Sequence, residues 1–306
     1  MYSDLVSRVR GYGLFVVGLV ICNSLPAAQV PTDAGEYLFR AAGCASCHTD
    51  VAGKGPALAG GRALETPFGT FYTPNITPDE NTGIGRWSAE DFLRALGEGT
   101  GPGNRHYYPV FPYTSYTRMK RDDMLALWRY LQTVPAVSRQ NRPHDLPWIM
   151  SFRLVNWAWK LLFFQPGAML PQAERSTPWN RGAYIAQALA HCGECHTPRN
   201  IFGVTRPHRR FAGTEDGPEG EPVPNITPDR DTGIGRWRKS EIVDYLQAGE
   251  LPDGDYAGGL MAEVIDDGLQ YLRPDDLQAL AEYLKSLPPL ASGVKEKPKP
   301  PKTSDY

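Results

Sequence analysis

The sequence of 306 residues has little cysteine, no excess of either charge and no long hydrophobic run. Five cysteines are too few for the disulfide-dense scaffolds of small secreted domains. With 32 basic and 34 acidic residues, the chain lacks the basic surface that nucleic-acid binding requires, so no nucleic acid is expected as a partner. Its one apolar run, residues 11–22, is shorter than the ~20 residues that span a bilayer. The composition predicts a globular protein of about two domains, at ~100–150 residues each.

Residues 1–28 predict an export signal peptide. Arg8 and Arg10 precede the apolar run, and a stretch of small residues at 26–28 follows it, which is the order of a secretory signal. We expect cleavage near Ala28 and a periplasmic protein, with an uncleaved N-terminal anchor as the alternative.

Four of the five cysteines form two pairs, and a histidine directly follows each pair. Cys-x-x-Cys-His is the attachment signature of haem c, because residues i and i+3 of a helical turn share a face from which both thiols reach one porphyrin edge. The histidine then becomes an axial ligand of the iron. We therefore predict two covalently bound haem c groups. The residues concerned are Cys44, Cys47 and His48 at the first site and Cys192, Cys195 and His196 at the second.

The alternatives for such pairs are a zinc site and a dithiol redox site. A structural zinc ion needs four ligands brought together, whereas these two clusters lie about 150 residues apart. A redox pair has no use for a histidine that always follows the second cysteine.

An internal repeat divides the chain. Residues 75–87, which begin with Asn-Ile-Thr-Pro-Asp and end with Gly-Ile-Gly-Arg-Trp, recur as residues 225–237, and each copy follows its cysteine motif at nearly the same spacing. This pattern indicates a duplicated fold. We expect a signal peptide at 1–28, a first domain at 31–140, a hydrophobic helical connector at 141–178, a second domain at 179–291 and a disordered tail rich in lysine and proline at 292–306.

The spacing of apolar residues predicts a mainly α-helical fold in both domains. Thr32 or Asp33 is a suitable cap for a first helix, and Ser88 and Asp91 are spaced as the capping box of a middle helix. The last helix of each domain, around residues 124–131 and 277–284, has apolar residues at helical spacing. The segments between the helices are rich in glycine and proline and show little strand alternation, so they are expected to be loops.

Three further segments resemble those of a known family. They are residues 108–116 (Tyr-Pro-Val-Phe-Pro-Tyr-Thr-Ser-Tyr), 179–184 (Trp-Asn-Arg-Gly-Ala-Tyr) and 191–200. With them, the chain from about residue 33 to 291 resembles the cytochrome c subunit of membrane-associated periplasmic dehydrogenases, which act on alcohols, aldehydes, gluconate or nicotinate.

The resemblance implies two tandem class I cytochrome c domains and an electron-transfer subunit that is not catalytic alone. It also implies a periplasmic dehydrogenase catalytic subunit as the partner, a quinone or a terminal oxidase as the acceptor, and a location at the membrane through peripheral contact.

A methionine opposite the histidine raises the potential of an electron-transfer haem. In the second domain the resemblance places this ligand at Met261, in the loop before the last helix. The first domain departs from the family pattern, because Phe111 stands where members often have methionine and a phenyl ring cannot bind iron. Met119 is the best remaining thioether, although counting back from the last helix aligns it with Leu272, an apolar packing position. His106 and an open site are the alternatives.

Other residues near the motifs are candidates for contacts with the haem. Arg86, Trp87, Arg236 and Trp237 would suit hydrogen bonds to haem propionates, or equally a solvated arginine beside a core tryptophan. Pro56 resembles the place where class I cytochromes direct a backbone carbonyl at the axial histidine, which implies that its carbonyl contacts the ring of His48. Such a contact fixes the orientation of the imidazole.

Residues 148–164 have one apolar face, from Trp148 to Trp159, and a narrow polar stripe of Arg153, Asn156 and Lys160. We expect either a connector packed between the two domains or a surface that docks on a membrane or on a dehydrogenase subunit.

Phe111 also leaves room for a different class of function. A diheme enzyme of the peroxidase or thiosulfate-oxidising type, with one unusually ligated haem, is the alternative to an electron carrier, and a haem-based sensor or assembly factor is a further one. The sequence itself shows no general base, nucleophile or substrate pocket.

Overall fold

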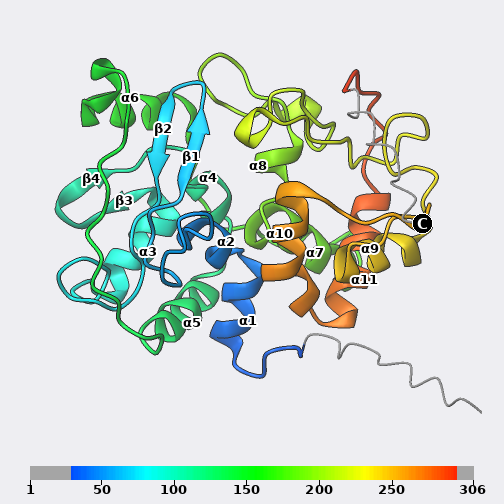
Figure 1. Cartoon of the computed structure of the whole chain (residues 1–306). Helices are drawn as coiled ribbons and strands as arrows, with labels where there is room; N and C mark the ends of the chain where they lie inside the picture. Colours follow the sequence, from blue (N-terminus) through cyan, green and yellow to red (C-terminus); the bar gives the residue numbers. More distant parts are fainter. Residues whose placement is uncertain (1–28, 295–306) are drawn as a thin grey trace, which may run out of the picture.

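The computed structural model describes residues 29–294, so the predicted signal peptide at 1–28 and residues 295–306 of the predicted tail lie outside the described residues. Within residues 29–294, helices joined by long loops make up most of the regular structure, with two short antiparallel hairpins (Figure 1). The prediction of a mainly α-helical fold is confirmed.

We call residues 31–140 the first half of the molecule. Strands β1 (Ala63–Thr66) and β2 (Gly69–Tyr72) form one hairpin, and β3 (Thr100–Gly101) and β4 (Arg105–His106) form the other. The helices are α1 (Ala34–Ala41), α2 (Cys44–His48), α3 (Ala89–Glu98), the short turn η1 (Pro102–Asn104), α4 (Tyr113–Tyr116) and α5 (Arg121–Leu131).

We call residues 177–291 the second half and the segment before it the connector, which holds η2 (Trp148–Ser151) and α6 (Arg153–Phe163). The second half holds α7 (Thr177–Tyr184), the π-helical turn η3 (Ile185–Leu189), α8 (Gly193–His196), η4 (Pro207–Arg209), η5 (Pro218–Gly220), α9 (Lys239–Ala248), α10 (Gly259–Asp267), η6 (Leu269–Tyr271) and α11 (Pro274–Lys285).

Side chains at the caps explain where several helices begin. Asp33 caps α1 by accepting a hydrogen bond from the amide three residues later, at 2.8 Å. Ser88 and Asp91 form the predicted capping box of α3. Helix α7 begins at Thr177, because Ser176 accepts a hydrogen bond from the amide of Trp179 at 3.1 Å and so caps the first turn.

In both halves the first and last helices cross at a glycine. Helix α1 packs on α5, and α7 packs on α11. A Cβ atom at Gly35 would collide with the carbonyl oxygen of Ala126, and one at Gly182 would collide with the carbonyl oxygen of Ala279. Only glycine therefore lets the two backbones approach so closely. The same crossing in both halves shows that the sequence repeat extends to the packing.

The second copy contains one additional residue in its first helix. Gly182 follows Gly35 by 147 positions, whereas His196 follows His48 by 148. The π-helical turn η3 lies between these two points, and a π turn takes up an inserted residue without ending the helix.

The two halves meet through a pair of equivalent contacts. The hydroxyl of Tyr37 in α1 donates to the carboxylate of Asp276 in α11, and the hydroxyl of Tyr184 in α7 donates to Asp123 in α5 at 2.6 Å. Arg181 adds an ion pair to Asp276 at 2.7 Å. Each half therefore gives the same tyrosine and the same aspartate to the other, which is the pattern of an interface with approximate twofold symmetry.

Helix α6 of the connector turns its polar stripe toward the first half. Asn156 is 2% exposed. The Lys160 amine donates to the Thr100 hydroxyl at 2.6 Å, and the Arg153 guanidinium donates to the carbonyl of His106 at 3.0 Å. These side chains satisfy backbone and hydroxyl groups of the β3–β4 hairpin, so the polar stripe acts as the inner face of α6.

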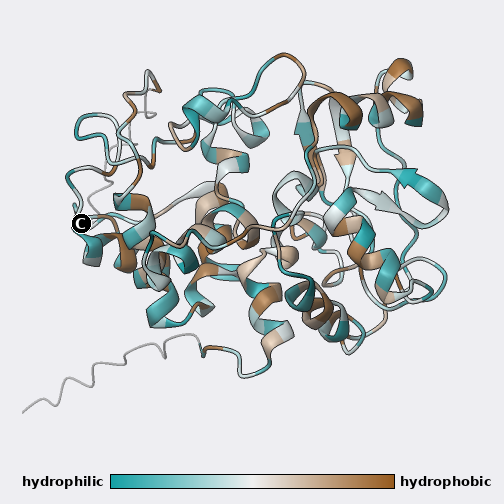
Figure 2. Cartoon of the chain, turned by 180° about the vertical axis from the view of Figure 1, so that it is seen from behind, coloured by the Kyte–Doolittle hydropathy of each residue, from teal (hydrophilic) through white to brown (hydrophobic). Residues whose placement is uncertain are grey.

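The apolar side chains of η2 and α6 consequently face outward, along the edge of the molecule that Figure 2 shows in brown. At its end α6 packs against the second half: Phe163 stacks 5.6 Å from Phe202, and the indole of Trp159 donates to the carbonyl of Phe202 at 2.8 Å. Trp148 and Phe152, at the start of the same segment, are exposed, so the expected packing between the two domains covers only part of this face. No helix of residues 29–294 combines the length and the apolar character needed to cross a bilayer. The most exposed apolar side chains of η2 and α6 are Trp148 (74%), Leu154 (70%), Leu161 (70%) and Leu162 (71%).

The β1–β2 hairpin lies in a segment that the sequence pattern assigns to loops. Its register pairs Ala63 with Tyr72, and Asp145 of the connector extends it by exchanging two backbone hydrogen bonds with Thr70. Four residues a strand are too few to show alternation in a sequence, which explains why the pattern misses the hairpin.

Replacing Gly182 with alanine should destabilise the protein by about 1–3 kcal/mol, because the added methyl group forces α7 away from α11. The free energy of unfolding from denaturant titration measures the change. Gly293→Ala is the control, since a Cβ atom there meets nothing within 4 Å. Equal losses in the two variants would contradict the importance of the helix crossing.

Candidate haem-binding sites

Two short helical turns present the cysteine and histidine side chains of the predicted sites. Cys44 and Cys47 lie on α2, and Cys192 and Cys195 lie at the start of and within α8. All four are free thiols, and Cys47 is exposed. Two thiols one turn apart with a histidine directly after them are the donor set that haem c attachment needs, so these residues fit the group.

The ring of each predicted axial histidine is held by a backbone carbonyl. The Nδ1 atom of His48 donates to the carbonyl of Pro74, and that of His196 donates to the carbonyl of Pro224, both at 2.8 Å. This contact leaves Nε2 as the nitrogen available to a metal. Burial lowers the pKa of both imidazoles, which favours the neutral form that binds metals.

The sequence-based prediction that Pro56 supplies the carbonyl for His48 is therefore wrong. Pro74 supplies it, and the carbonyl of Pro56 instead accepts a bond from the amide of Ala59 at 3.3 Å. A backbone carbonyl carries no side-chain signature, so only the folded loop reveals which residue provides it.

Asn75, the residue after Pro74, organises the loop that carries this carbonyl. Its side chain is 2% exposed. Its Oδ1 atom accepts bonds from the amide and the hydroxyl of Thr77 at 2.9 and 2.8 Å, and its Nδ2 atom donates to the hydroxyl of Thr82 and the carbonyl of Val137 at 3.1 and 2.7 Å. The amide group thus ties the loop to itself and to the chain that follows the last helix.

Asn225 does the same in the second half, with Thr227, Thr232 and the carbonyl of Leu290 as its partners. The repeated Asn-Ile-Thr-Pro-Asp segment is therefore a scaffold for the carbonyl that orients the histidine. The sequence shows the repeat but not this role.

A glycine lets each of these loops pass close to the histidine. The amides of Gly60 and Gly213 donate to the carbonyls of His48 and His196, both at 2.8 Å, and both glycines have positive φ angles of 68° and 76°. A Cβ atom at Gly60 would collide with the backbone of residues 73–74. Any other residue would push that loop away from the imidazole.

Met261, the predicted second-site ligand, lies in the first turn of α10 rather than in a loop as the sequence analysis expects. Its side chain is partly buried and packs against the core. This position suits an axial ligand, and the assignment stays a prediction.

The structure places the first-site candidates in different surroundings. Met119 is 1% exposed and enclosed in the core, just before α5. The ring of His106 is turned toward the connector, with Nδ1 3.2 Å from the amine of Lys160. Phe111 packs at the margin of the core, as Met261 does. The choice between Met119, His106 and an open site stays a prediction at this point.

The predicted propionate partners lie in one loop of each half. The guanidinium of Arg86 is exposed and donates to Asn81 at 2.9 Å, and that of Arg236 pairs with Asp231 at 2.8 Å. Their neighbours Trp87 and Trp237 are partly buried against the core. Each arginine is thus bonded within its own loop, and contact with propionates stays a prediction.

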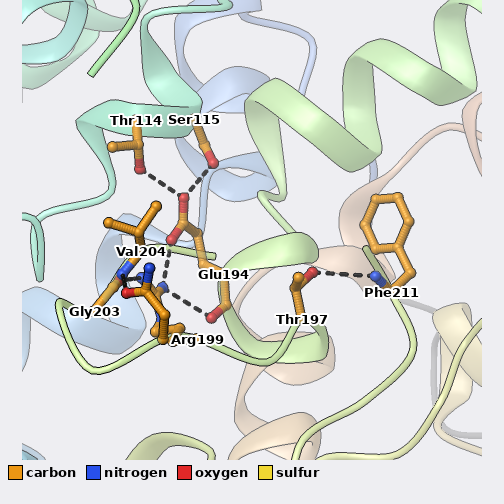
Figure 3. Close-up of polar contacts among 9 residues, drawn as sticks. Thr114, Ser115, Glu194, Thr197, Arg199, Gly203, Val204 and Phe211 are labelled. Carbon is orange, nitrogen blue, oxygen red and sulfur yellow. Dashed lines mark hydrogen bonds and ion pairs between the residues drawn. The ribbon is translucent and has the colours of Figure 1, made fainter. Parts of the chain in front are cut away.

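Glu194, which stands between the two cysteines of the second motif, is a functional residue that the sequence analysis missed. Its carboxylate accepts bonds from the hydroxyls of Thr114 and Ser115 in the first half and pairs with Arg199 at 2.6 Å (Figure 3). Burial opposes ionisation, but the charge of Arg199 and these hydroxyls hold the pKa of Glu194 below its usual value. The second site is thereby fixed directly to the first half.

Arg62 makes the corresponding link from the first half. Its guanidinium donates to the carbonyl of Ser46, between the first pair of cysteines, at 2.7 Å and pairs with Glu263 of α10 at 2.5 Å. Glu263 lies two residues after Met261. Both cysteine motifs are therefore tied across the interface between the halves.

Within residues 29–294, no group of three or more His, Cys, Asp or Glu side chains is arranged so that it could hold a metal ion.

Comparisons with known proteins agree with this geometry. The family model described as cytochrome c matches residues 32–135. The chain is 43% identical over 258 residues to a protein named "Diheme cytochrome c-type" of Cereibacter sphaeroides, in an alignment that covers 83% of this chain and 85% of that one.

Two other relatives are larger proteins. The chain is 40% identical to a subunit of nicotinate dehydrogenase from Pseudomonas putida, covering 83% of this chain and 21% of the relative. It is 34% identical to the cytochrome c subunit of a quinone-dependent alcohol dehydrogenase of Gluconobacter oxydans, covering 92% of this chain and 60% of the relative. The chain thus spans less than two thirds of either.

Replacing Asn75 with alanine should lower the free energy of unfolding, by about 1–3 kcal/mol for each buried partner left unpaired. Asn225→Ala should act similarly in the second half. Asn81→Ala is the control, because that side chain is exposed and bonds only the exposed Arg86 among the residues described. Denaturant titration measures all three variants. If Asn81→Ala lowered the free energy of unfolding as much as Asn75→Ala does, the hydrogen bonds of Asn75 would not be what stabilises the loop.

Proposed function

This chain belongs to the family of diheme c-type cytochromes, and from that premise we propose that it takes single electrons from the catalytic subunit of a periplasmic dehydrogenase and passes them to a quinone or a terminal oxidase. The observation that carries the proposal is that two complete Cys-x-x-Cys-His turns are each tied across the interface between the halves, the first through Arg62 and Glu263 and the second through Glu194. An electron carrier needs its redox centres held at fixed positions in this way.

Each half would act as one class I cytochrome c domain with its own covalently bound haem. The thiols of α2 would hold one porphyrin and those of α8 the other, and His48 and His196 would be the axial ligands. The bound haem supplies a one-electron couple at each site. The chain's own residues orient the two imidazoles through Pro74 and Pro224 and fix the sites relative to each other through Arg62 and Glu194.

The names of the relatives support an electron-transfer subunit rather than a catalytic one. Those matched over most of this chain include cytochrome subunits of alcohol, gluconate and fructose dehydrogenases. In such complexes the substrate is oxidised on another subunit, and a cytochrome subunit serves as the electron acceptor. A periplasmic location, which the sequence predicts from residues 1–28, agrees with haem c attachment outside the cytoplasm.

The purified protein should weigh more than its amino acids by two haem groups, and dithionite should deliver about two electrons per molecule. Replacing Cys192 and Cys195 with serine should remove one haem and halve the electron capacity. The matched control replaces Cys44 and Cys47 and should give the same result for the other haem. Mass spectrometry and reductive titration measure both quantities.

The role as an acceptor is tested by mixing the oxidised protein with reduced catalytic subunits of quinoprotein, flavin and molybdenum dehydrogenases. We expect at least one class to reduce both haems within milliseconds to seconds, monitored by haem absorbance. If dithionite reduces the protein but no dehydrogenase of the three classes does, the proposed function is wrong.

We further propose that the outward face of η2 and α6 rests on the surface of a lipid membrane. Bulky apolar side chains cover it, no acidic residue lies between residues 146 and 173, and the two basic residues there, Arg153 and Lys160, point away from it toward the β3–β4 hairpin. Tryptophan and leucine exposed on one face of a short helix are typical of helices that lie in the membrane interface. A dehydrogenase subunit on this face is the other outcome that the test separates.

Replacing Leu154, Trp157 and Leu161 with serine should reduce binding to phosphatidylglycerol-containing vesicles at least tenfold, because the apolar area that enters the interface is lost. Co-sedimentation measures the binding. Tyr256→Ser is the control, since that side chain is 64% exposed in the second half and lies outside the face. Unchanged vesicle binding, with loss of binding to the dehydrogenase instead, would assign the face to the protein partner.

A further inference from the structure

We infer that the iron of the first site has no ligand from the chain opposite His48, and that it binds a small uncharged molecule such as carbon monoxide or nitric oxide. The place that Met261 takes in the second half belongs to Phe111 in the first. The inference rests on haem binding at the first motif and not on the identity of the electron donor or acceptor, so it can fail while the proposed function stands.

The backbone fixes the equivalence of the two positions. Helices α3 and α9 both end at a glycine with a left-handed conformation, Gly99 and Gly249, with φ angles of 58° and 73°. The carbonyl of Gly99 accepts a bond from the amide of Tyr107 at 2.9 Å, and that of Gly249 accepts one from the amide of Ala257 at 2.8 Å. Both bonds span eight residues, so the two loops run in the same register.

Counting four residues on from each of these amides reaches the ligand position. In the second half the count ends at Met261, and in the first half it ends at Phe111. The two side chains also share their degree of burial, because both are partly exposed and pack at the margin of the core. A phenyl ring has no lone pair to give to iron, so the substitution removes the ligand and keeps the shape of the loop.

Aromatic rings surround Phe111 and hold it in place. Its ring centroid lies 5.8 Å from that of Tyr107, 5.9 Å from that of Tyr116 and 6.3 Å from that of Tyr113. Tyr113 and Tyr116 are buried. Interlocked rings at these separations stabilise one another, which makes a rearrangement that brings a distant side chain to the iron costly.

Met119 takes the position in the first half that Leu272, a packing residue, takes in the second half. Met119 and Leu272 each directly precede the cap of the last helix, at Lys120 and Arg273, and each is 1% exposed. The amide of Met119 bonds the carbonyl of Tyr116 at 2.9 Å, and the amide of Leu272 bonds the carbonyl three residues before it at 3.0 Å. A position that leucine fills in one half supplies core packing rather than a metal ligand.

His106 is occupied elsewhere. Its ring faces the amine of Lys160 at 3.2 Å, on the connector side of the β3–β4 hairpin. In the register set by Gly99 and Gly249, the equivalent residue of the second half is Tyr256, which is 64% exposed and so lies at the surface. With Met119 and His106 both placed outside the ligand position, the open site is the alternative that the structure favours.

The aromatic surroundings also indicate which ligands the site accepts. Phe111 itself offers neither a positive charge nor a hydrogen-bond donor, so the side chain in the ligand position does nothing to stabilise an anion, and a small uncharged diatomic molecule suits it better.

The test uses the purified diheme protein and measures carbon monoxide binding after reduction, together with the spin state after oxidation. We expect about one carbon monoxide per molecule, a high-spin ferric signal from one of the two haems, and a methionine-to-iron charge-transfer band from the other alone. Two low-spin haems with no carbon monoxide binding would overturn the inference.

Three variants identify the residues. Phe111→Met should abolish carbon monoxide binding and about double the charge-transfer band, whereas Met119→Leu and His106→Ala should change neither. The matched control in the second half, Met261→Leu, should remove the band and raise binding to about two carbon monoxide molecules. A loss of low-spin signal from the first haem in Met119→Leu or His106→Ala would overturn the inference. These two variants still test the inference if Phe111→Met does not fold.

Discussion

The orientation of one imidazole ring in each half is the constraint on which the surrounding structure depends. The ring is fixed by the carbonyl of Pro74 or Pro224, and that carbonyl is in place only because the next residue, a buried asparagine, bonds its own loop and the segment after the last helix. Loss of a hydrogen-bond partner would leave this buried amide group unpaired and lower the free energy of unfolding. The most strongly repeated sequence of the chain therefore serves to position a backbone atom rather than to contact the metal.

The duplicated fold also accounts for how the two halves are held together. Because each half supplies the same tyrosine and the same aspartate, the interface is self-complementary and fixes an approximate twofold relation between the halves. Residues that break this symmetry lie closest to the sites. Glu194 and Arg62 have no repeated counterpart at their positions, and each bonds the opposite half beside a cysteine motif or the predicted methionine ligand. The symmetric contacts thus hold the halves together, and the asymmetric contacts tie each site to the opposite half.

Much of this arrangement can be predicted from the sequence where the signal is local. The caps at Asp33 and Ser88 and the repeat itself depend on side chains a few residues apart, and the sequence pattern identifies them. The same pattern assigns the partner of His48 to Pro56 wrongly, because a carbonyl 26 positions away leaves no mark in the sequence. The sequence also separates the polar face of α6 from its apolar face. It does not predict which of the two faces packs on the protein, because a hydrophobic pattern contains no information about the neighbouring segments.

The difference between the halves is chemical rather than architectural, and this has a consequence for the direction of electron flow. Gly99 and Gly249 keep the two ligand loops in one register, so exchanging a thioether for a phenyl ring at position 111 changes the site without altering the fold. An axial methionine raises the potential of a haem. A first site that lacks this ligand, as we propose, would have the lower potential, and downhill transfer across the interface would run from the first half to the second. The dehydrogenase would then be expected to deliver electrons near α2, on the same half of the molecule that holds α6 by its polar stripe.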